Sequence, residues 1–157
     1  MSDITIRAAQ AGDHDELFAM YAAVVEEGGA FPREPPATVE IFHEGWMDGK
    51  TGVYVALLNG AVAGSYHLLP NYEGLAAHIA NAGYMVAPEF RRRGVGRALV
   101  EHSLSEAARQ GFDAMMFNLV FESNPARRLY EQLGFEVVGR VPDAIGGKDA
   151  IVYWRRL

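Results

Sequence analysis

Apolar and polar positions along the chain follow two repeating patterns, and the first of them predicts β-strands. Residues 3–8 alternate apolar and polar side chains, as a strand with one buried face does. Asn59-Gly60 separates two apolar runs and tolerates the positive φ angles of a two-residue hairpin turn. Residues 112–120 are mostly apolar, which is typical of a strand covered on both faces. The strands are expected at residues 3–8, 52–58, 61–69, 76–86, 112–120, 135–139 and 150–154.

The second pattern, apolar residues at helical spacing, predicts helices between these strands. In the shortest of them, Asn124 takes the cap position, Pro125 the first helical position, and Gly134 ends the helix. The helix after residue 38 has an apolar face made by Val39, Phe42 and Trp46. The helices are expected at residues 13–27, 38–46, 95–110 and 124–134.

The order of these elements indicates the fold class. Strands first, followed by alternating strands and helices, imply an α/β (α+β) protein with a mixed sheet and helices on both faces. The chain of 157 residues suits one domain, over residues 1–157, with its own core. The first residues lack a basic segment followed by a long apolar one, and no apolar run approaches the roughly 20 residues that span a bilayer. We therefore expect a cytoplasmic protein without a membrane partner.

Charge is distributed unevenly along the chain. The net charge of −6 argues against sequence-independent nucleic-acid binding. Residues 1–90 carry three basic and twelve acidic side chains, whereas residues 91–157 carry eleven basic and eight acidic ones. An anionic ligand is thus expected on the C-terminal half. The chain has no cysteine and its five histidines show no ligand spacing, so neither a disulfide nor a metal is expected.

One segment between a predicted strand and a predicted helix combines glycines with arginines. Gly94 and Gly96 lack a Cβ, so backbone N–H groups at the helix start can approach an anion closely. The forked donors that suit phosphate oxygens come from Arg91, Arg92, Arg93 and Arg97. The segment fails the G-x-G-x-x-G dinucleotide pattern, and no Gly-Lys-Ser/Thr follows, so a different phosphate cofactor is implied. A solvated arginine run beside two turn glycines is the alternative.

Two motifs in this half resemble those of the Gcn5-related N-acetyltransferase (GNAT) superfamily. Arg91-Arg92-Arg93-Gly94-Val95-Gly96 matches the Arg/Gln-x-x-Gly-x-Gly/Ala fingerprint at a strand-to-helix turn. The stretch from Asn124 to Tyr130, followed by Leu133-Gly134-Phe135, matches a second block, Asn-x-x-Ala-x-x-Leu-Tyr and Leu-Gly-Phe. The resemblance implies a mixed, mostly antiparallel sheet of six to seven strands with about four helices.

The resemblance also implies direct transfer of an acetyl group from acetyl-coenzyme A to an amine, without a metal. Tyr84 N–H would donate to the thioester oxygen, and Gly83 would permit a bulge that leaves this N–H unpaired. Tyr130 would donate a proton to the leaving thiolate, and Asn124 would contact the cofactor as well as cap its helix. The cofactor-binding residues implied are Tyr84, Met85, Val86, Arg91, Arg92, Arg93, Gly94, Val95, Gly96, Arg97, Ala98, Asn124, Arg127 and Tyr130.

The acceptor is less well defined by the sequence. The segments around Asn81 and Asn118 look like those of fungal acetyltransferases that modify proline analogues such as azetidine-2-carboxylate, and both amides would then orient a small acceptor. The aromatic residues that could line its pocket are Phe31, Trp46, Tyr66 and Tyr72. The candidates for the general base are Glu27, Glu73, His67 and His78, or a water chain held by Asn81 and Asn118.

Three functions remain open from the sequence. The first is an acetyl-coenzyme A-dependent N-acetyltransferase that acts on a small amine or amino acid. The second is a non-catalytic domain that binds or senses acyl-coenzyme A, and the third is an acetyltransferase acting on a protein N-terminus or lysine. Relatives in the superfamily often dimerise, so a homodimer is also an expectation, although no residue specifies its interface.

Overall fold

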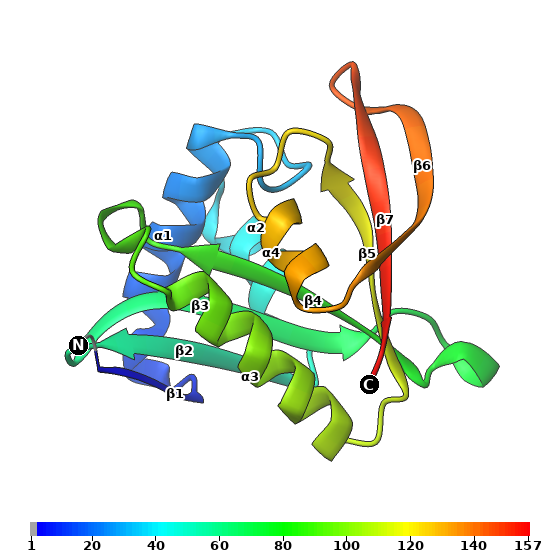
Figure 1. Cartoon of the computed structure of the whole chain (residues 1–157). Coiled ribbons are helices and arrows are strands. Elements are labelled where there is room, and N and C mark those ends of the chain that lie inside the picture. Colours follow the sequence, from blue (N-terminus) through cyan, green and yellow to red (C-terminus); the bar gives the residue numbers. More distant parts are fainter. Residues whose placement is uncertain (1–2) are drawn as a thin grey trace.

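A computed structural model describes residues 3–157, and these form a seven-stranded sheet (Figure 1). The strand order is β1-β2-β3-β4-β5-β7-β6, and only β4 and β5 pair in parallel. The mixed, mostly antiparallel sheet is therefore confirmed. The strands are β1 Ile4–Ala8, β2 Gly52–Leu58, β3 Ala61–Pro70, β4 Ile79–Val86, β5 Ala114–Phe121, β6 Glu136–Ile145 and β7 Lys148–Arg156. Met1 and Ser2, at the terminus where no leader was expected, lie outside the described residues.

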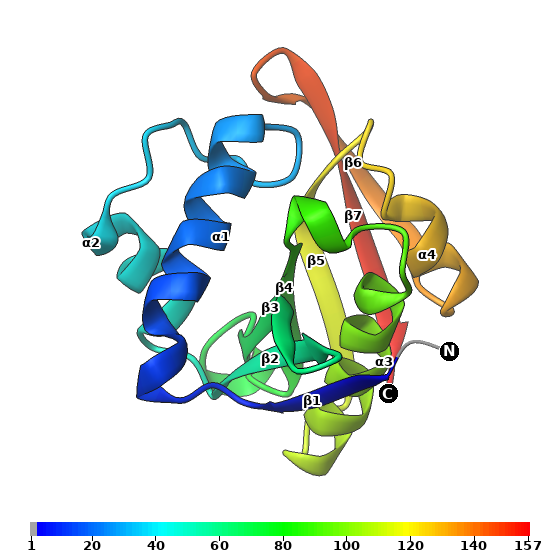
Figure 2. The same cartoon turned by 90° about the vertical axis from the view of Figure 1, so that its left-hand side faces the viewer.

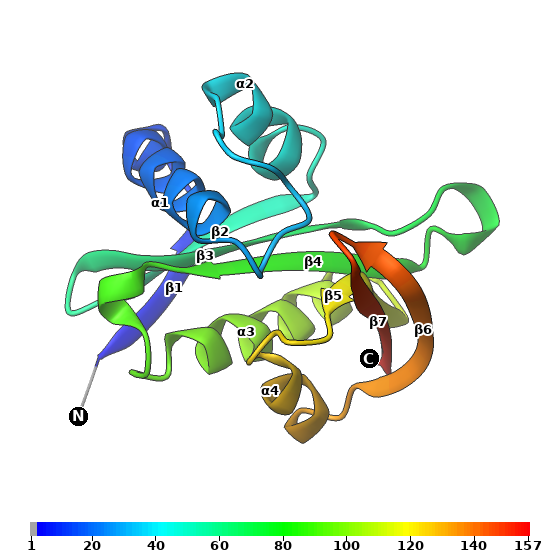
Figure 3. The ribbon, with the colours of Figure 1, turned by 90° about the horizontal axis from the view of Figure 1, so that it is seen from above.

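Helices cover both faces of the sheet. In Figure 3 α1 and α2 lie on one face and α3 and α4 on the other, and Figure 2 shows the same separation from the side. A five-residue π-helical turn, His43–Met47, continues α2. The α-helices are α1 His14–Glu27, α2 Val39–Phe42, α3 Val95–Arg109 and α4 Arg127–Gln132. No helix within residues 3–157 is long and apolar enough to cross a membrane.

The core is divided by the sheet into two layers. On the face of α1 and α2, the fully buried Phe42 and Trp46 pack with the apolar side of α1. On the face of α3 and α4, Leu99 of α3 packs with Tyr66 of β3 and Tyr153 of β7. Burying side chains of this size contributes about 1.5–3 kcal/mol each, so both layers hold their helices firmly against the sheet.

Some boundaries differ from the sequence-based expectation. β4 starts at Ile79 rather than residue 76, because residues 74–76 form a 3₁₀ turn. α4 starts at Arg127, since Asn124 and Pro125 belong to the turn before it. The Asn124 side chain accepts a hydrogen bond from the Ala126 N–H at 2.9 Å, so it stabilises that turn instead of the helix proper.

One strand and one helix depart from their predicted burial. Between Phe117 and Val120 the β5–β7 register shifts, because two residues of β5 stand opposite one residue of β7. This bulge leaves Leu119 44% exposed, so the expectation that β5 is covered on both faces is wrong there. Val39, placed on the apolar face of the second helix, is 41% exposed.

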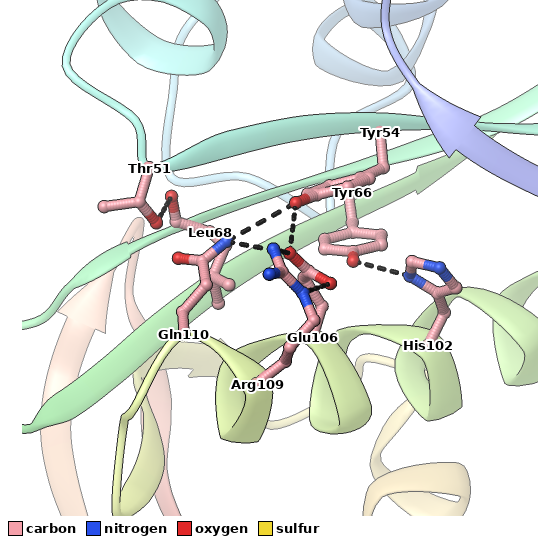
Figure 4. Close-up of polar contacts among 8 residues, drawn as sticks. All are labelled: Thr51, Tyr54, Tyr66, Leu68, His102, Glu106, Arg109 and Gln110. Carbon is pink, nitrogen blue, oxygen red and sulfur yellow. Dashed lines mark hydrogen bonds and ion pairs between the residues drawn. The ribbon is translucent and has the colours of Figure 1, made fainter.

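Polar groups fasten the C-terminal half of α3 to the sheet (Figure 4). The Tyr54 hydroxyl donates to Glu106 at 2.8 Å, and Arg109 forms an ion pair with the same carboxylate. Tyr66 and His102 share a hydrogen bond of 2.7 Å one turn earlier. Hydrogen bonds, above all from Arg109, lower the pKa of Glu106 to about 2. α3 is thus held at a fixed position beside β2 and β3.

Candidate active site

The candidate site begins where the two parallel strands separate. β4 and β5 pair only at Ile79 with Ala114 and at Ala80 with Met115. Beyond these positions lies a cavity of about 840 Å³. Its walls are the later part of β4, the far end of β5, the starts of α3 and α4, and the segment that follows α1. A cavity of this size can hold a ligand of several hundred daltons.

The backbone of β4 offers unpaired groups to this cavity. The antiparallel β3–β4 ladder is bounded by hydrogen bonds from Ala87 N–H to Ala63 O and from Asn71 N–H to Ile79 O, both 2.8 Å. Because inter-strand bonds alternate, the odd-numbered residues of β4 bond to β3. The N–H and C=O groups of the even-numbered residues, including Tyr84, therefore point toward the side where β5 has moved away.

Gly83 does not form the bulge that was expected of it. The register between β3 and β4 is unbroken from Gly64–Val86 to Pro70–Ala80, so the divergence of β5, not a bulge, frees the Tyr84 N–H. A Cβ at Gly83 would lie 2.9 Å from the His67 ring. The glycine is needed for this close packing.

The start of α3 provides a second set of unpaired donors. Gly94 is the N-cap residue of α3 and has a φ of 85°. Because glycine has no side chain that could cap the helix, the first N–H groups of α3 remain available. A Cβ at Gly96 would lie 3.9 Å from Val86 and 4.0 Å from Leu129, which is ordinary contact. Packing within the protein therefore does not require glycine at position 96, whereas a ligand that approaches the helix closely does.

The structure places most of the residues predicted for coenzyme binding around one cavity. Those that line it are Tyr84, Met85, Val86, Arg91, Arg92, Gly94, Val95, Gly96, Asn124 and Tyr130. Those that do not are Arg93, Arg97, Ala98 and Arg127.

The arginines outside the lining have partners within the protein. Arg93 lies over the Phe90 ring, with 5.8 Å from its guanidinium carbon to the ring centroid. Arg97 donates to Gln132 at 2.8 Å. Arg127 donates to the Tyr153 hydroxyl at 2.9 Å and joins α4 to β7. These contacts assign Arg97 and Arg127 to the packing around α4.

Tyr130 is the tyrosine of α4 that faces the cavity. Its side chain is only 8% exposed and lies against Phe117 and Phe135. Burial raises the pKa of Tyr130, so the phenol keeps its proton at neutral pH. Within residues 3–157 its hydroxyl has no hydrogen-bond partner, in contrast to Tyr84, whose hydroxyl bonds Ser103 at 2.6 Å. The Tyr130 proton is thus free to reach a ligand in the cavity.

Asn81, Asn118 and Phe31, which were predicted to contact the acceptor, line the same cavity. The other predicted aromatic residues lie elsewhere. Tyr66 and Trp46 are fully buried core residues, so neither lines the cavity. Tyr72 is exposed in the loop between β3 and β4, where its hydroxyl contacts the Met116 sulfur.

The four candidate side chains are poorly suited to act as the base in this cavity. Glu27 lines the cavity, but the Arg91 guanidinium bonds its carboxylate at 2.9 Å and lowers the pKa of Glu27. Burial and the nearby charge of Lys50 lower the pKa of His67 to about 3. Neither Glu73 nor His78 lines the cavity.

Sequence reasoning identified only Phe31 in one wall of the cavity. The segment from Gly28 to Pro32 leaves the end of α1 and lines the cavity opposite β4 and β5. The signal for this wall lies in the Gly28-Gly29 pair, which directly follows the helix expected at residues 13–27. Both glycines have positive φ angles, 75° and 84°, so they turn the chain back over the sheet.

Comparison with known proteins places the chain among the acyltransferases. Residues 16–135 match the model described as the Acetyltransferase (GNAT) family, and the chain belongs to that family. It is 34% identical over 143 residues to the N-acetyltransferase aca1 of Schizosaccharomyces pombe. The alignment covers 90% of this chain and 61% of that relative, so the chain spans less than two thirds of the relative's length.

Two solved structures share the fold. A GCN5-related N-acetyltransferase from Kribbella flavida superposes with a TM-score of 0.91 at 35% identity, covering 98% of each chain. A GNAT superfamily phosphinothricin acetyltransferase from Sinorhizobium meliloti, solved in complex with acetyl-coenzyme A, gives a TM-score of 0.87 at 24% identity. This second comparison covers 98% of the present chain and 88% of the other.

Proposed function

We propose that this chain transfers the acetyl group of acetyl-coenzyme A to the nitrogen of a small amine or amino acid. The observation that carries the proposal is the meeting of three features in one cavity. These are the unpaired backbone edge of β4, the uncapped start of α3, and the Tyr130 side chain, whose hydroxyl has no partner within residues 3–157. Membership of the GNAT family supports the reaction class.

The residues present fit a coenzyme that carries a diphosphate and an amide-containing arm. The N–H groups at the start of α3 favour an anion, and Arg92 lines the cavity beside them. The even-numbered residues of β4 would pair with the arm as a neighbouring strand does. The space beside Gly96, which a side chain would fill, supports close approach of the diphosphate.

Two groups would act on the reacting atoms. Acetyl-coenzyme A supplies the activated acetyl group as a thioester. Tyr84 N–H would donate to the thioester oxygen as negative charge develops there, a contribution worth about 10²–10³ in rate for one such donor. Tyr130 would give its proton to the departing sulfur, since burial keeps that proton bound until it is needed.

The part of the cavity lined by Asn81, Asn118 and Phe31, where the acceptor would bind, favours a small molecule with its own polar groups. Within residues 3–157, the charged side chains that line the whole cavity are Glu27, Arg91 and Arg92, and Glu27 is neutralised by Arg91. Each of Asn81 and Asn118 carries both a donor and an acceptor. Two such amides suit an amino acid, whose carboxylate accepts hydrogen bonds and whose amine donates them, and a proline analogue is one example.

Deprotonation of the amine is assigned to water held by Asn81 and Asn118. An alkylammonium has a pKa near 10, so a proton must leave before attack. Glu27 is engaged by Arg91, and His67 is weakly basic and outside the cavity lining. Water ordered by the two amides could carry the proton to solvent.

The test is release of free thiol from acetyl-coenzyme A in the presence of a panel of amines and amino acids that includes azetidine-2-carboxylate. We expect release that depends on the amine and yields an equal amount of acetylated product. Acetyl-coenzyme A binding without release for any amine would support the non-catalytic binding domain instead. Acetylation of peptides alone would support a protein acceptor.

A further inference from the structure

Asn118 reaches the cavity because of the bulge in β5. Phe117 pairs with Tyr153 and Val120 with Ile151, so the two residues between them stand opposite a single residue of β7. Both of these residues are turned outward, whereas Phe117 and Val120 are buried. Bulges of this kind redirect a side chain beside a functional site. The Asn118 amide is consequently exposed at the cavity wall with little packing to hold it.

A second amide from another strand pairs with it. Asn71 donates from Nδ2 to Asn118 Oδ1 at 3.1 Å, and Asn118 donates from Nδ2 to Asn71 Oδ1 at 2.7 Å. Asn71 itself is fixed in place, because its backbone N–H bonds Ile79 O at the end of the β3–β4 ladder. Asn71 does not line the cavity, so it contacts Asn118 on the side that faces away from the cavity.

The orientation of the two amide groups in this pair also has a structural cause. A reciprocal amide pair could form with both amides reversed, because oxygen and nitrogen occupy similar positions. Asn71 Nδ2 additionally lies 4.0 Å from the Met116 sulfur, a weak acceptor. The sulfur accepts from nitrogen but has nothing to donate to oxygen, so it favours one orientation of Asn71 and, through it, one orientation of Asn118.

We propose that Asn71 is a positioning residue that fixes the orientation in which Asn118 presents one N–H and one carbonyl lone pair to the acceptor. This inference rests on the proposed function. The free N–H would bind an acceptor oxygen, and the free lone pair would hold its amine through the water that takes up the proton. The geometry therefore favours amines that carry a carboxylate or carbonyl close to the nitrogen. Without Asn71 the amide would turn freely, and half of its orientations would oppose such an acceptor.

The kinetic test compares Asn71→Leu, Asn118→Ala and the double variant, with azetidine-2-carboxylate as acceptor. Loss of a neutral hydrogen-bonded pair commonly weakens binding about tenfold, so Asn71→Leu should raise the acceptor KM by about that factor. The acetyl-coenzyme A KM and the melting temperature should stay unchanged. In the Asn118→Ala background the same substitution should have no further effect.

Leu75→Ser is the matched control, because Leu75 is fully exposed in the same loop. It should leave the acceptor KM unaltered. An unchanged acceptor KM in Asn71→Leu, or an effect that adds in full to that of Asn118→Ala, would overturn the positioning role.

A spectroscopic measurement separates this inference from the proposed function. The side-chain amide signals of Asn118 in ¹⁵N-labelled protein should shift and exchange faster in Asn71→Leu, but not in Leu75→Ser. If wild-type protein fails to acetylate azetidine-2-carboxylate, the acceptor assignment fails, yet these signals still report whether Asn71 holds Asn118. Signals that Asn71→Leu leaves unchanged would overturn the inference at any level of activity.

Discussion

The two ends of α3 differ in whether their polar groups have hydrogen-bond partners within the protein. At the C-terminal end Glu106 accepts hydrogen bonds from a tyrosine, an arginine and a glutamine, as Figure 4 shows. At the N-terminal end Gly94 provides no side-chain cap, and the first N–H groups of the helix face a cavity. Buried or enclosed polar groups are normally satisfied. The end with satisfied groups fastens the fold, whereas the end with open groups is the place where a ligand is expected.

The largest effect should come from filling the space at the N-terminal end of α3. Gly96→Leu places a side chain where coenzyme A is proposed to approach, and we expect its affinity for coenzyme A to fall by about 100-fold or more. Because leucine is the better helix former, the variant should gain about 0.5–1 kcal/mol of stability. Calorimetric titration with coenzyme A and thermal unfolding measure the two quantities.

Gly12→Leu is the control for this substitution. A Cβ at Gly12 would meet nothing within 4 Å, and the residue lies outside the cavity lining. Its coenzyme A affinity should equal that of wild type. Tight binding by Gly96→Leu would rule out the start of α3 as the diphosphate site.

Removal of the Tyr130 hydroxyl should have the next largest effect. Tyr130→Phe keeps the packing against Phe117 but loses the proton that the leaving sulfur is proposed to take, so turnover should fall about 100-fold. Acetyl-coenzyme A affinity should remain. Tyr153→Phe removes a hydroxyl that bonds Arg127 and Glu131, and it should reduce stability more than turnover. Equal turnover in Tyr130→Phe and wild type would exclude the acid role.

Asn81→Ala should weaken acceptor binding while sparing the coenzyme. The loss of one amide contact raises the acceptor KM about tenfold by the usual strength of a hydrogen bond. Steady-state kinetics with azetidine-2-carboxylate as the varied substrate measure this. If the KM is unaltered for every amine in a panel, Asn81 does not contact the acceptor.

The smallest effect should come from Glu106, at the C-terminal end of α3. The Glu106 side chain is 11% exposed and its pKa is lowered to about 2. Its ionised form therefore stabilises the fold above about pH 5, and this stabilisation is lost as the pH falls toward 2. Glu106→Gln should therefore cost about 1–2 kcal/mol at pH 7 and much less at pH 3. Urea unfolding at both pH values tests this, with turnover at pH 7 unchanged. A cost that is equal at the two pH values would argue against the ion pair as its cause.

Much of the fold followed from local patterns, and the exceptions have physical reasons. The Asn59-Gly60 hairpin and the stretch from Gly94 into α3 appear as expected because local backbone preference decides them. The bulge at Asn118 depends on how β5 pairs with a distant strand, which no local pattern reveals. The pairing of Asn71 with Asn118 joins residues 47 positions apart and has the same origin.

The candidate site shows a similar division. Gly94 and Gly96 were predicted from sequence because close approach of a phosphate needs a residue without a Cβ, and both line the cavity. Their contact with a phosphate stays a prediction. Tyr66 was misplaced because composition cannot tell a core aromatic residue from one that lines a cavity. The role expected of Gly83 was wrong for another reason: strand divergence frees the Tyr84 N–H, and divergence is a property of the whole sheet.

The most direct test follows the backbone amides of ¹⁵N-labelled protein during titration with acetyl-coenzyme A. The account predicts large shifts for the N–H signals of Tyr84, Val95 and Gly96, at the edge of β4 and the start of α3, while Glu106 and Gln110 at the other end stay in place. Shifts confined to the C-terminal end of α3, or a Tyr84 signal that does not move at saturation, would contradict it.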